Sequence, residues 1–311
     1  MAGVTRALAA ALAIALAGCG RAPEVSGDRL PKFVQPTGTA PRIALVLGSG
    51  GPRGFAHIGV LKALEDAGIK PDLIVGSSVG SMVGALYASG VGAGDLERMA
   101  YDLNLIQFFE WRMLGGKNPS GAAVQNYVNE NVKGLPIEKL RTRFVATATR
   151  LSDGKLVLFN HGDTGLAVRA SSASPGQFEP VMIGNDRYVD SDEASPVPIH
   201  AARMLGARVV IAVDVSAYVE STPPGVPQEW VSKDARRAKQ VSLEAPEADV
   251  LIHPDIGYYA GENEAYRRRV IAVAERVTRD KIPAIRVALE RAGLQTAGAS
   301  TARMPSGEAS R

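Results

Sequence analysis

The sequence predicts an α/β fold with a mostly parallel central sheet flanked by helices. The first indication is a set of short apolar runs rich in β-branched residues, such as residues 43–47 and 73–75, which are typical of strands buried on both faces. The second is that stretches with apolar residues at spacings of three and four follow these runs, as in residues 55–67 and 78–89. Strands that alternate with helices in this way favour parallel pairing, with helices packed on the sheet faces.

The same two patterns, with Gly and Pro as boundaries, predict the elements that come after residue 89. The predicted helices cover residues 93–104, 123–133, 164–173, a segment from Pro196 or Pro198 to Leu205, and residues 263–292. The predicted strands cover residues 144–149 and 156–159, a hairpin across 179–189, and residues 208–215 and 249–252. Residues 216–246 are rich in Pro and charged side chains, and we expect them to form a long surface excursion.

The composition is that of an ordinary globular protein of 311 residues, with 46% hydrophobic and 22% charged residues. The 35 Lys and Arg nearly balance the 32 Asp and Glu, and aromatic residues make up only 5%. We therefore expect no nucleic-acid partner, because such proteins need a basic surface and aromatic groups for base stacking. The single cysteine excludes an intramolecular disulfide and a cysteine cluster for metal, and we expect neither a metal nor another cofactor.

The amino terminus has the pattern of a targeting signal. Residues 1–18 contain Arg6 and then an apolar run of Ala and Leu, which is too short for a comfortable membrane span but typical of a signal peptide. The run ends in Leu16-Ala17-Gly18-Cys19, which resembles the bacterial lipobox, and this resemblance implies that Cys19 becomes the lipidated first residue of the mature chain. Gly20 stands where an inner-membrane retention signal would need Asp, so we expect a lipid anchor in the outer membrane, facing the periplasm. The alternative is a soluble secreted protein with an unrelated cysteine.

These observations divide the chain into four parts. Residues 1–18 are the expected signal peptide, and residues 19–41, with many Pro and Gly and few apolar residues, are the expected flexible tether. Residues 42–292 carry all of the predicted helices and strands and form the expected domain. The small, polar residues 293–311 form the expected disordered tail.

The most informative motif is Gly76-Ser77-Ser78-Val79-Gly80, a G-x-S-x-G that lies where a predicted strand turns into a helix. In this position Gly76 and Gly80 allow the backbone to crowd at the turn, and Ser78 projects its hydroxyl at the mouth of the helix. The N–H groups of the helix N-terminus could stabilise a developing oxyanion there. The sequence therefore predicts a nucleophile elbow at Ser78, and the alternative is a plain Gly/Ser turn that caps a helix.

A second glycine-rich turn, residues 48–54, connects the first predicted strand to the first predicted helix. A dinucleotide-binding loop is one interpretation, but the G-x-G-x-x-G spacing from Gly48 and Gly50 requires Gly at the position of Arg53. The second strand also leads into Ser78 and not into the acidic residue that would hold a ribose. We expect instead that Gly50 and Gly51 direct their N–H groups toward Ser78 as an oxyanion hole, with Arg53 holding the loop in place.

A serine nucleophile needs a base, and the chain offers two kinds of candidate. Asp190 follows the predicted hairpin and is placed at the end of a strand. A Ser-His-Asp triad is the alternative, because histidines also follow this segment in the chain order of the α/β-hydrolases. The four histidines are His57, His161, His200 and His253. The glycine loop and the Asp at a hairpin end fit a dyad better than a triad.

Phe108, Phe109 and Trp111 place three aromatic side chains within four residues. Core packing is one interpretation. In a lipidated protein such a cluster could also form an interfacial patch or lid that faces the bilayer or the substrate.

With these motifs in this order, the chain resembles the bacterial patatin-like phospholipases from about Arg42 to Val215. The matching pieces are LVLGSGGPRGFAHIGVLKALEDAGI, IVGSSVGSMVGALYASG, AVRASSASPGQFEPV and YVDSDEASPVP. The resemblance implies a patatin-like fold and a Ser–Asp dyad that cleaves lipid acyl esters without a catalytic histidine or a metal. It also implies that Ser78 is the nucleophile, that Asp190 is the base, and that the oxyanion loop contains Gly50, Gly51 and Arg53.

The chain departs from the family pattern at two places. Ser49 stands where the family usually has Gly, and Ser191-Asp192 stand where it has Gly-Gly or Gly-Ala. We expect serine to match the backbone conformation of these glycines only at a cost. Asp192 adds a second carboxylate, which would raise the pKa of Asp190 if both side chains face the site.

The sequence thus predicts a lipid-anchored serine hydrolase of the bacterial envelope. Its expected substrates are the acyl esters of phospholipids or lysophospholipids, and its expected membrane contact is the lipid on Cys19. The competing hypothesis is a catalytically weak or inactive envelope lipoprotein that has kept the fold and binds lipid or a protein partner.

Overall fold

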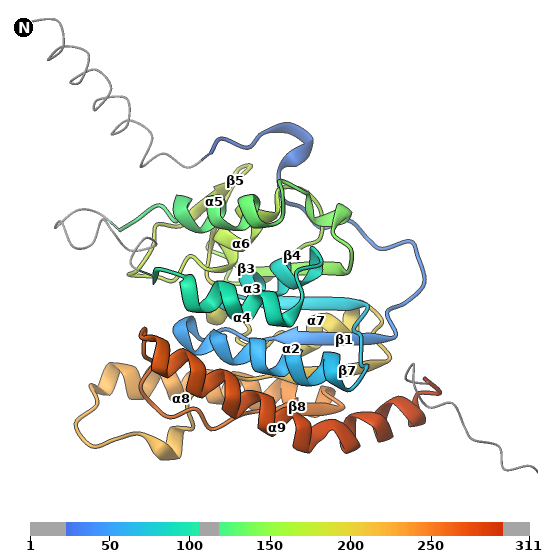
Figure 1. The fold of residues 1–311 in the computed structure, drawn as a ribbon. Coiled ribbons are helices and arrows are strands. Elements are labelled where there is room, and N and C mark those ends of the chain that lie inside the picture. The colour runs from blue at the N-terminus through green and yellow to red at the C-terminus, as the bar shows by residue number, and fades with distance from the viewer. Residues whose placement is uncertain (1–22, 106–117, 295–311) are drawn as a thin grey trace, which may run out of the picture.

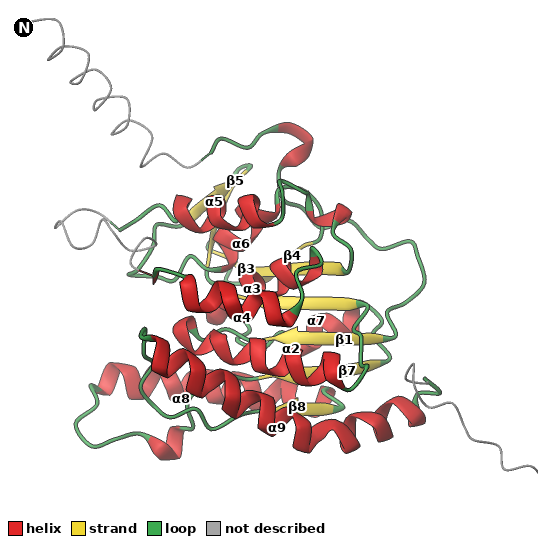
Figure 2. Cartoon of the chain, in the orientation of Figure 1, coloured by secondary structure: helices red, strands yellow, loops and turns green. Residues whose placement is uncertain are grey.

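The computed structural model describes residues 23–105 and 118–294, and within them it confirms the predicted α/β fold (Figures 1 and 2). One sheet runs through these residues in the strand order β5-β6-β3-β2-β1-β7-β8, with β4 paired to β3. The strands are β1 Ile43–Leu47, β2 Leu73–Ser77, β3 Arg143–Arg150, β4 Leu156–Phe159, β5 Val181–Ile183, β6 Asp186–Val189, β7 Val209–Val213 and β8 Val250–Ile252.

The sheet is parallel through its centre and antiparallel at one side. β1 lies between β2 and β7, and β3 and β8 extend the parallel pairing outward on either side. β4, β5 and β6 join through antiparallel pairs beside β3. All five residues of each of β1, β2 and β7 are buried, which explains why these strands appear in the sequence as uninterrupted apolar runs.

Helices cover both faces of the sheet (Figure 1). The helices are α2 Ala56–Asp66, α3 Val79–Ala88, α4 Ala93–Asp102, α5 Ala122–Asn131, α6 Thr164–Ser171, α7 Ile199–Met204, α8 Gln228–Glu244 and α9 Glu264–Arg291. Alternate residues of β1 face opposite layers, as a strand's period of two requires. Leu45 belongs to the core shared with α2, α3 and α9, whereas Val46 belongs to a second core shared with α7 and with Val241 of α8.

This topology brings the predicted motifs to one edge of the sheet. The carboxyl ends of adjacent parallel strands meet at the same edge, where ligands of open α/β sheets bind. β1 ends in the glycine-rich loop, which forms a short 3₁₀ helix over Gly51–Phe55 before α2. β2 ends at Ser77, directly before Ser78. The hairpin of β5 and β6 delivers Asp190 beside them.

The surface excursion expected across residues 216–246 is where the structure differs most from the prediction, because it contains the 17-residue helix α8. Within α8 only Val241 is buried, so the helix has almost no apolar stripe. Its other side chains are mostly polar or charged, and several of them face the loop after Asp190. A helix of this kind has no hydrophobic periodicity from which the sequence could predict it.

The expected tether also differs from the prediction over the residues that the structure describes. Lys32 forms a β-bridge with His161, and the side-chain amide of Asn160 both donates to and accepts from the backbone of Val34 at 2.8 Å. Arg29 forms an ion pair with Asp163 at 3.3 Å. Residues 23–41 therefore lie along the domain, because polar groups of the 160–163 turn supply partners that the Pro- and Gly-rich composition does not reveal.

Several predictions lie outside the described residues. These are the signal peptide with Cys19, the aromatic cluster of Phe108, Phe109 and Trp111, and the tail from residue 295 onward. Of the expected tail only Gly293 and Leu294 are described, and Leu294 is buried against the core. No helix within residues 23–105 and 118–294 combines the length and the apolar character that crossing a membrane would need.

Candidate active site

Ser78 stands on a sharp strand-to-helix turn with a backbone conformation that side chains rarely adopt. Its φ is 52° and its ψ is −124°, and α3 begins at the next residue. Two local hydrogen bonds hold the turn. The carbonyl oxygen of Ser78 accepts from the N–H of Ser81 at 2.8 Å and from the hydroxyl of Ser81 at 2.6 Å. The Ser78 N–H donates to the hydroxyl of Ser171 in α6 at 2.9 Å. These contacts fix the elbow that the G-x-S-x-G motif predicts.

The two glycines of this motif are required by close backbone approach. A Cβ on Gly76 would lie 2.4 Å from the Cα of Ser81, and a Cβ on Gly80 would lie 2.2 Å from the carbonyl oxygen of Leu47. The second contact shows that the first turn of α3 packs directly on the end of β1. The glycine-rich loop that continues from β1 therefore lies beside Ser78.

Asp190 is the partner of the Ser78 hydroxyl. The Ser78 Oγ donates to the Asp190 Oδ2 at 2.7 Å, although 112 residues separate the two in the chain. Both side chains are buried, with Asp190 only 4% exposed. Burial, and after it the nearby Asp192 carboxylate, raise the pKa of Asp190 to about 7, although the N–H of Asp192 and the Ser78 hydroxyl oppose the shift. The resulting carboxylate is a stronger base than an ordinary aspartate.

The glycine-rich loop offers free donors beside this pair. The N–H groups of Gly50 and Gly51 find no acceptor among the described residues. The φ of Gly51 is +54°, a conformation that favours glycine. Arg53 does not contact Ser78 but donates to the carbonyl oxygen of Tyr258, and burial lowers the pKa of its guanidinium. Arg53 thus links the loop to the segment before α9.

Two of the departures from the family pattern, Ser49 and Asp192, form a network with Arg237. The Ser49 hydroxyl donates to the Asp192 Oδ1, and Arg237 of α8 lies 3.2 Å from the same carboxylate oxygen. Arg237 also donates to the carbonyl oxygen of Ser49. Because a trans peptide directs its C=O and its N–H to opposite sides, this bond also sets the direction of the Gly50 N–H. Arg237 therefore holds both loops that meet at Ser78.

The expected strain at the two substituted positions is not present. Among the described residues only Ser78 and Lys133 combine a side chain with positive φ, so neither Ser49 nor Ser191 occupies a glycine conformation. The Ser191 hydroxyl instead lies 2.6 Å from that of Ser77, in a fully buried contact. Serine at these positions replaces backbone freedom with side-chain hydrogen bonds.

No histidine contacts Ser78 or Asp190, which argues against the triad. His57 is fully buried and donates from Nε2 to the carbonyl oxygen of Gly48 at 2.8 Å, and burial lowers its pKa to about 4. His57 is therefore neutral and holds the first residue of the glycine loop, Gly48, through this hydrogen bond. The other three histidines pair elsewhere, namely His161 with Asn160, His200 with Glu247, and His253 with Ser216.

Sequence reasoning missed three residues that shape the site: Arg237, Ser171 and His57 in its supporting role. Arg237 lies in a segment without a helical pattern, and Ser171 is one of several serines in the 171–174 region, so neither carries a local signal. His57 lies three residues past the glycine loop, as the second residue of α2, and this position was the available signal. Within residues 23–105 and 118–294 no group of three or more His, Cys, Asp or Glu side chains has the geometry of a metal site.

Comparisons with known proteins identify several relatives of this chain. An uncharacterized NTE family protein of Mycobacterium tuberculosis is 34% identical over 211 residues, which make up 64% of this chain and 57% of that protein. Lysophospholipase NTE1 of Coccidioides immitis is 34% identical over 191 residues, or 59% of this chain and 12% of that protein. Human patatin-like phospholipase domain-containing protein 6 is 33% identical over 192 residues, or 59% and 14%. The match thus spans little more than half of the mycobacterial protein and a small part of the other two.

Among solved structures, VipD from Legionella pneumophila aligns with a TM-score of 0.48 at 12% identity, over 88% of this chain and 72% of that one. The profile of the family described as patatin-like phospholipase matches residues 45–203, which include the glycine loop, Ser78 and Asp190. This span is just over half of the 311 residues. The chain belongs to the patatin-like phospholipase family.

Proposed function

We propose that this protein is a serine hydrolase that cleaves carboxylic acyl esters of phospholipids or lysophospholipids with Ser78 and Asp190. The observation that carries the proposal is the 2.7 Å hydrogen bond from the Ser78 hydroxyl to a buried carboxylate at a strained elbow. Family membership and the lysophospholipase named among the relatives support a lipid ester as substrate. The same geometry favours an active enzyme over a lipoprotein that has kept only the fold.

The reaction follows from the positions of these groups. As the Ser78 Oγ attacks the acyl carbonyl carbon, its proton passes to Asp190, and the N–H groups of Gly50 and Gly51 stabilise the oxyanion. The ester C–O bond then breaks, and the leaving alcohol takes the proton from Asp190. A water molecule next attacks the acyl-serine with Asp190 again as base, which releases the fatty acid and restores the hydroxyl.

The test is the hydrolysis of p-nitrophenyl butyrate and a lysophospholipid by the purified chain. Ser78→Ala and Asp190→Asn should each lower kcat/KM by about 10³-fold or more, and the double variant should lose little beyond that, because the two residues act as one unit. Ser89→Ala is the matched control, since its hydroxyl only caps the far end of α3. Full activity in folded Asp190→Asn would refute the dyad, and full activity in Ser78→Ala would refute the hydrolase.

The proposal also covers the amino terminus: Cys19 carries a lipid that anchors the protein in the bacterial outer membrane, facing the periplasm. The support is the sequence Leu16-Ala17-Gly18-Cys19 behind a short apolar run. Cys19→Ala should abolish labelling by a fatty-acid probe and release the protein from the outer-membrane fraction. A Cys19→Ala protein that is still labelled and still sediments with the outer membrane would contradict this anchor.

A further inference from the structure

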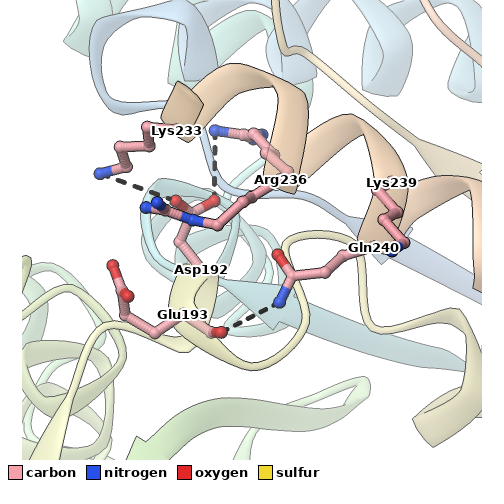
Figure 3. A pocket seen from close by; sticks show the side chains of 7 residues that line it. Asp192, Glu193, Lys233, Arg236, Lys239 and Gln240 are labelled. Atoms are coloured by element: carbon pink, nitrogen blue, oxygen red, sulfur yellow. Dashed lines mark hydrogen bonds and ion pairs between the residues drawn. The ribbon is translucent and has the colours of Figure 1, made fainter. Parts of the chain in front are cut away.

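A cavity of about 230 Å³ lies between α8 and the loop that follows Asp190 (Figure 3). Its lining includes the charged side chains of Asp192, Glu193, Lys233, Arg236, Arg237 and Lys239. Four of these are cations and two are carboxylates, so the charges that line the cavity are net positive. The family profile ends at residue 203, and α8 with its four cations therefore lies outside the matched part of the chain.

The cations of α8 fall into two pairs. Arg237 lies 3.2 Å and Lys233 lies 3.9 Å from the carboxylate of Asp192, so these two compensate its charge. Arg236 and Lys239 form no ion pair with any residue that the structure describes, and both are exposed toward solvent. Charges that no internal partner neutralises are available to a ligand, and an Arg guanidinium matches the geometry of a phosphate group.

The cavity is linked to the reacting atoms through Asp192, although neither Ser78 nor Asp190 lines it. The N–H of Asp192, whose side chain lines the cavity, donates to the Asp190 Oδ1 at 2.9 Å. The other oxygen of Asp190 accepts from the Ser78 hydroxyl. In a phospholipid or lysophospholipid only the glycerol unit separates the acyl ester from the phosphate. With the ester at Ser78, the phosphate of such a lipid therefore lies only a glycerol unit away from the reacting atoms, which makes this cavity a candidate for its site.

We propose that Arg236 and Lys239 form a binding site for a phosphate group, and that this group is the phosphodiester of the lipid substrate. The proposal rests on the hydrolase function proposed above and assigns the head-group side of that site. Free inorganic phosphate has the same chemistry, and the experiment below separates the two sources.

The experiment compares two substrates with the same acyl chain and the same kind of ester, oleoyl lysophosphatidylglycerol and monooleoylglycerol, on the full chain. Arg236→Gln/Lys239→Gln should lower the ratio of kcat/KM for the phospholipid over the monoacylglycerol by roughly tenfold. The matched control is Arg276→Gln/Lys281→Gln on α9, which removes the same charge from exposed positions that do not line the cavity. This control should keep the wild-type ratio.

A measurement at high salt tests whether the effect is a local contact. If the difference between the two double variants disappears completely in high salt, the cations only attract anionic lipid from a distance, and the site is refuted. A ratio that stays tenfold lower supports the direct contact.

Titration with inorganic phosphate, monitored by calorimetry, measures binding without the need for turnover. If the substrate ratio is unchanged but phosphate binds the wild type and not Arg236→Gln/Lys239→Gln, the site takes free phosphate. If neither the ratio nor phosphate binding changes, the proposal is wrong. Should Ser78→Ala leave ester cleavage intact, the hydrolase function fails, whereas the titration still decides whether the phosphate site exists.

Discussion

At the scale of single residues, the reactivity that we propose for the site comes from two features that are costly to the fold. Ser78 holds a φ of 52°, in a region that costs of order 1–3 kcal/mol for a residue with a side chain. Asp190 is a carboxyl group at 4% exposure, whose pKa burial and the Asp192 carboxylate raise to about 7. Both features destabilise the native state, and both favour the transfer of the Ser78 proton to Asp190.

The raised pKa of Asp190 predicts how activity depends on pH. Asp190 accepts a proton only when it is ionised, so kcat/KM should rise with pH through a limb near 7. Asp192→Asn removes a neighbouring negative charge, which favours the ionised form and should move this limb to lower pH. The limb should stay above the ordinary pKa of 3.8, because burial is the larger cause of the shift. The measurement is the pH profile of p-nitrophenyl butyrate hydrolysis, and an unmoved limb in Asp192→Asn would contradict the assignment.

The hydrogen bond of Ser49 predicts that glycine is not the better residue at this position in this chain. Ser49→Gly removes the hydroxyl that donates to Asp192 and adds backbone freedom to the glycine-rich loop. We expect kcat to fall by about threefold to tenfold, because Asp192 loses a donor that holds it in place. The measurement is steady-state kinetics beside Ser49→Ala, which removes the same hydroxyl with less backbone freedom and should lose less. A kcat above that of the wild type in Ser49→Gly would show that serine strains the loop.

The decisive structure at the scale of elements is α8, which bridges the two loops at the carboxyl edge of the sheet. Through Arg237 it contacts the Ser49 carbonyl at the end of β1 and the Asp192 carboxylate beyond β6. Through Gln240 it contacts the carbonyl oxygen of Glu193 at 3.0 Å (Figure 3). Because only Val241 of the helix is buried, α8 packs on the domain mainly through polar side chains such as Arg237 and Gln240.

Arg237→Gln tests this bridge. The substitution frees the Ser49 peptide and leaves the Asp192 carboxylate without its closest cation, so kcat/KM should fall roughly tenfold or more. A less compensated Asp192 should also raise the pKa of Asp190 and move the acid limb of the pH profile to higher pH. Arg237→Lys should recover only part of the rate, because one ammonium group cannot replace the guanidinium fork.

The control for Arg237→Gln is Arg286→Gln on α9, which removes an exposed arginine that has no ion pair among the described residues. This variant should leave both kcat/KM and the acid limb of the pH profile unchanged. A lower rate in Arg237→Gln with an unmoved limb would mean that Arg237 supports only the fold of α8.

At the scale of the whole molecule, the folded domain includes more of the chain than the composition indicates, because the 23–41 segment lies along the turn that follows β4. Its contacts are polar and few: the bridge of Lys32 with His161, the paired bonds of Asn160 with Val34, and the ion pair of Arg29 with Asp163. Such a segment opens locally at a smaller free energy than the global unfolding of the domain.

Asn160→Ala should release this segment without unfolding the domain. Two hydrogen bonds to the backbone of Val34 are lost, each worth about 0.5–1.5 kcal/mol, and Tm should fall by only a few degrees. Limited trypsin digestion should then cut after Lys32 at least several times faster than in the wild type. Gln177→Ala, an exposed side-chain amide in another turn, is the control and should digest at the wild-type rate. Equal cleavage in Asn160→Ala would show that the segment is held by other contacts.

The sequence by itself determined the elements whose function is local. The apolar runs of β1 and β2 indicate strands that are buried and do not lie at the surface. The glycines on either side of Ser78 are required because a Cβ at these positions would lie only 2.2–2.4 Å from another backbone atom. Both signals lie within a few residues of the structure they specify, and they sufficed to predict the sheet, the elbow and the loop. Asp190 could be singled out for the same reason, since it directly follows a hairpin strand.

The tertiary structure alone decided which distant side chains these local elements contact. The contact of Ser78 with Asp190 joins residues 112 apart, that of Ser49 with Asp192 joins residues 143 apart, and that of Arg237 with the Ser49 carbonyl joins residues 188 apart. Polar contacts over such distances leave no periodicity in the sequence, because hydrophobic patterning reports which face of an element is buried and not which polar group it finds. For this reason the serines at positions 49 and 191 appeared as unfavourable exchanges for glycine, whereas packing makes them hydrogen-bonding partners of Asp192 and Ser77.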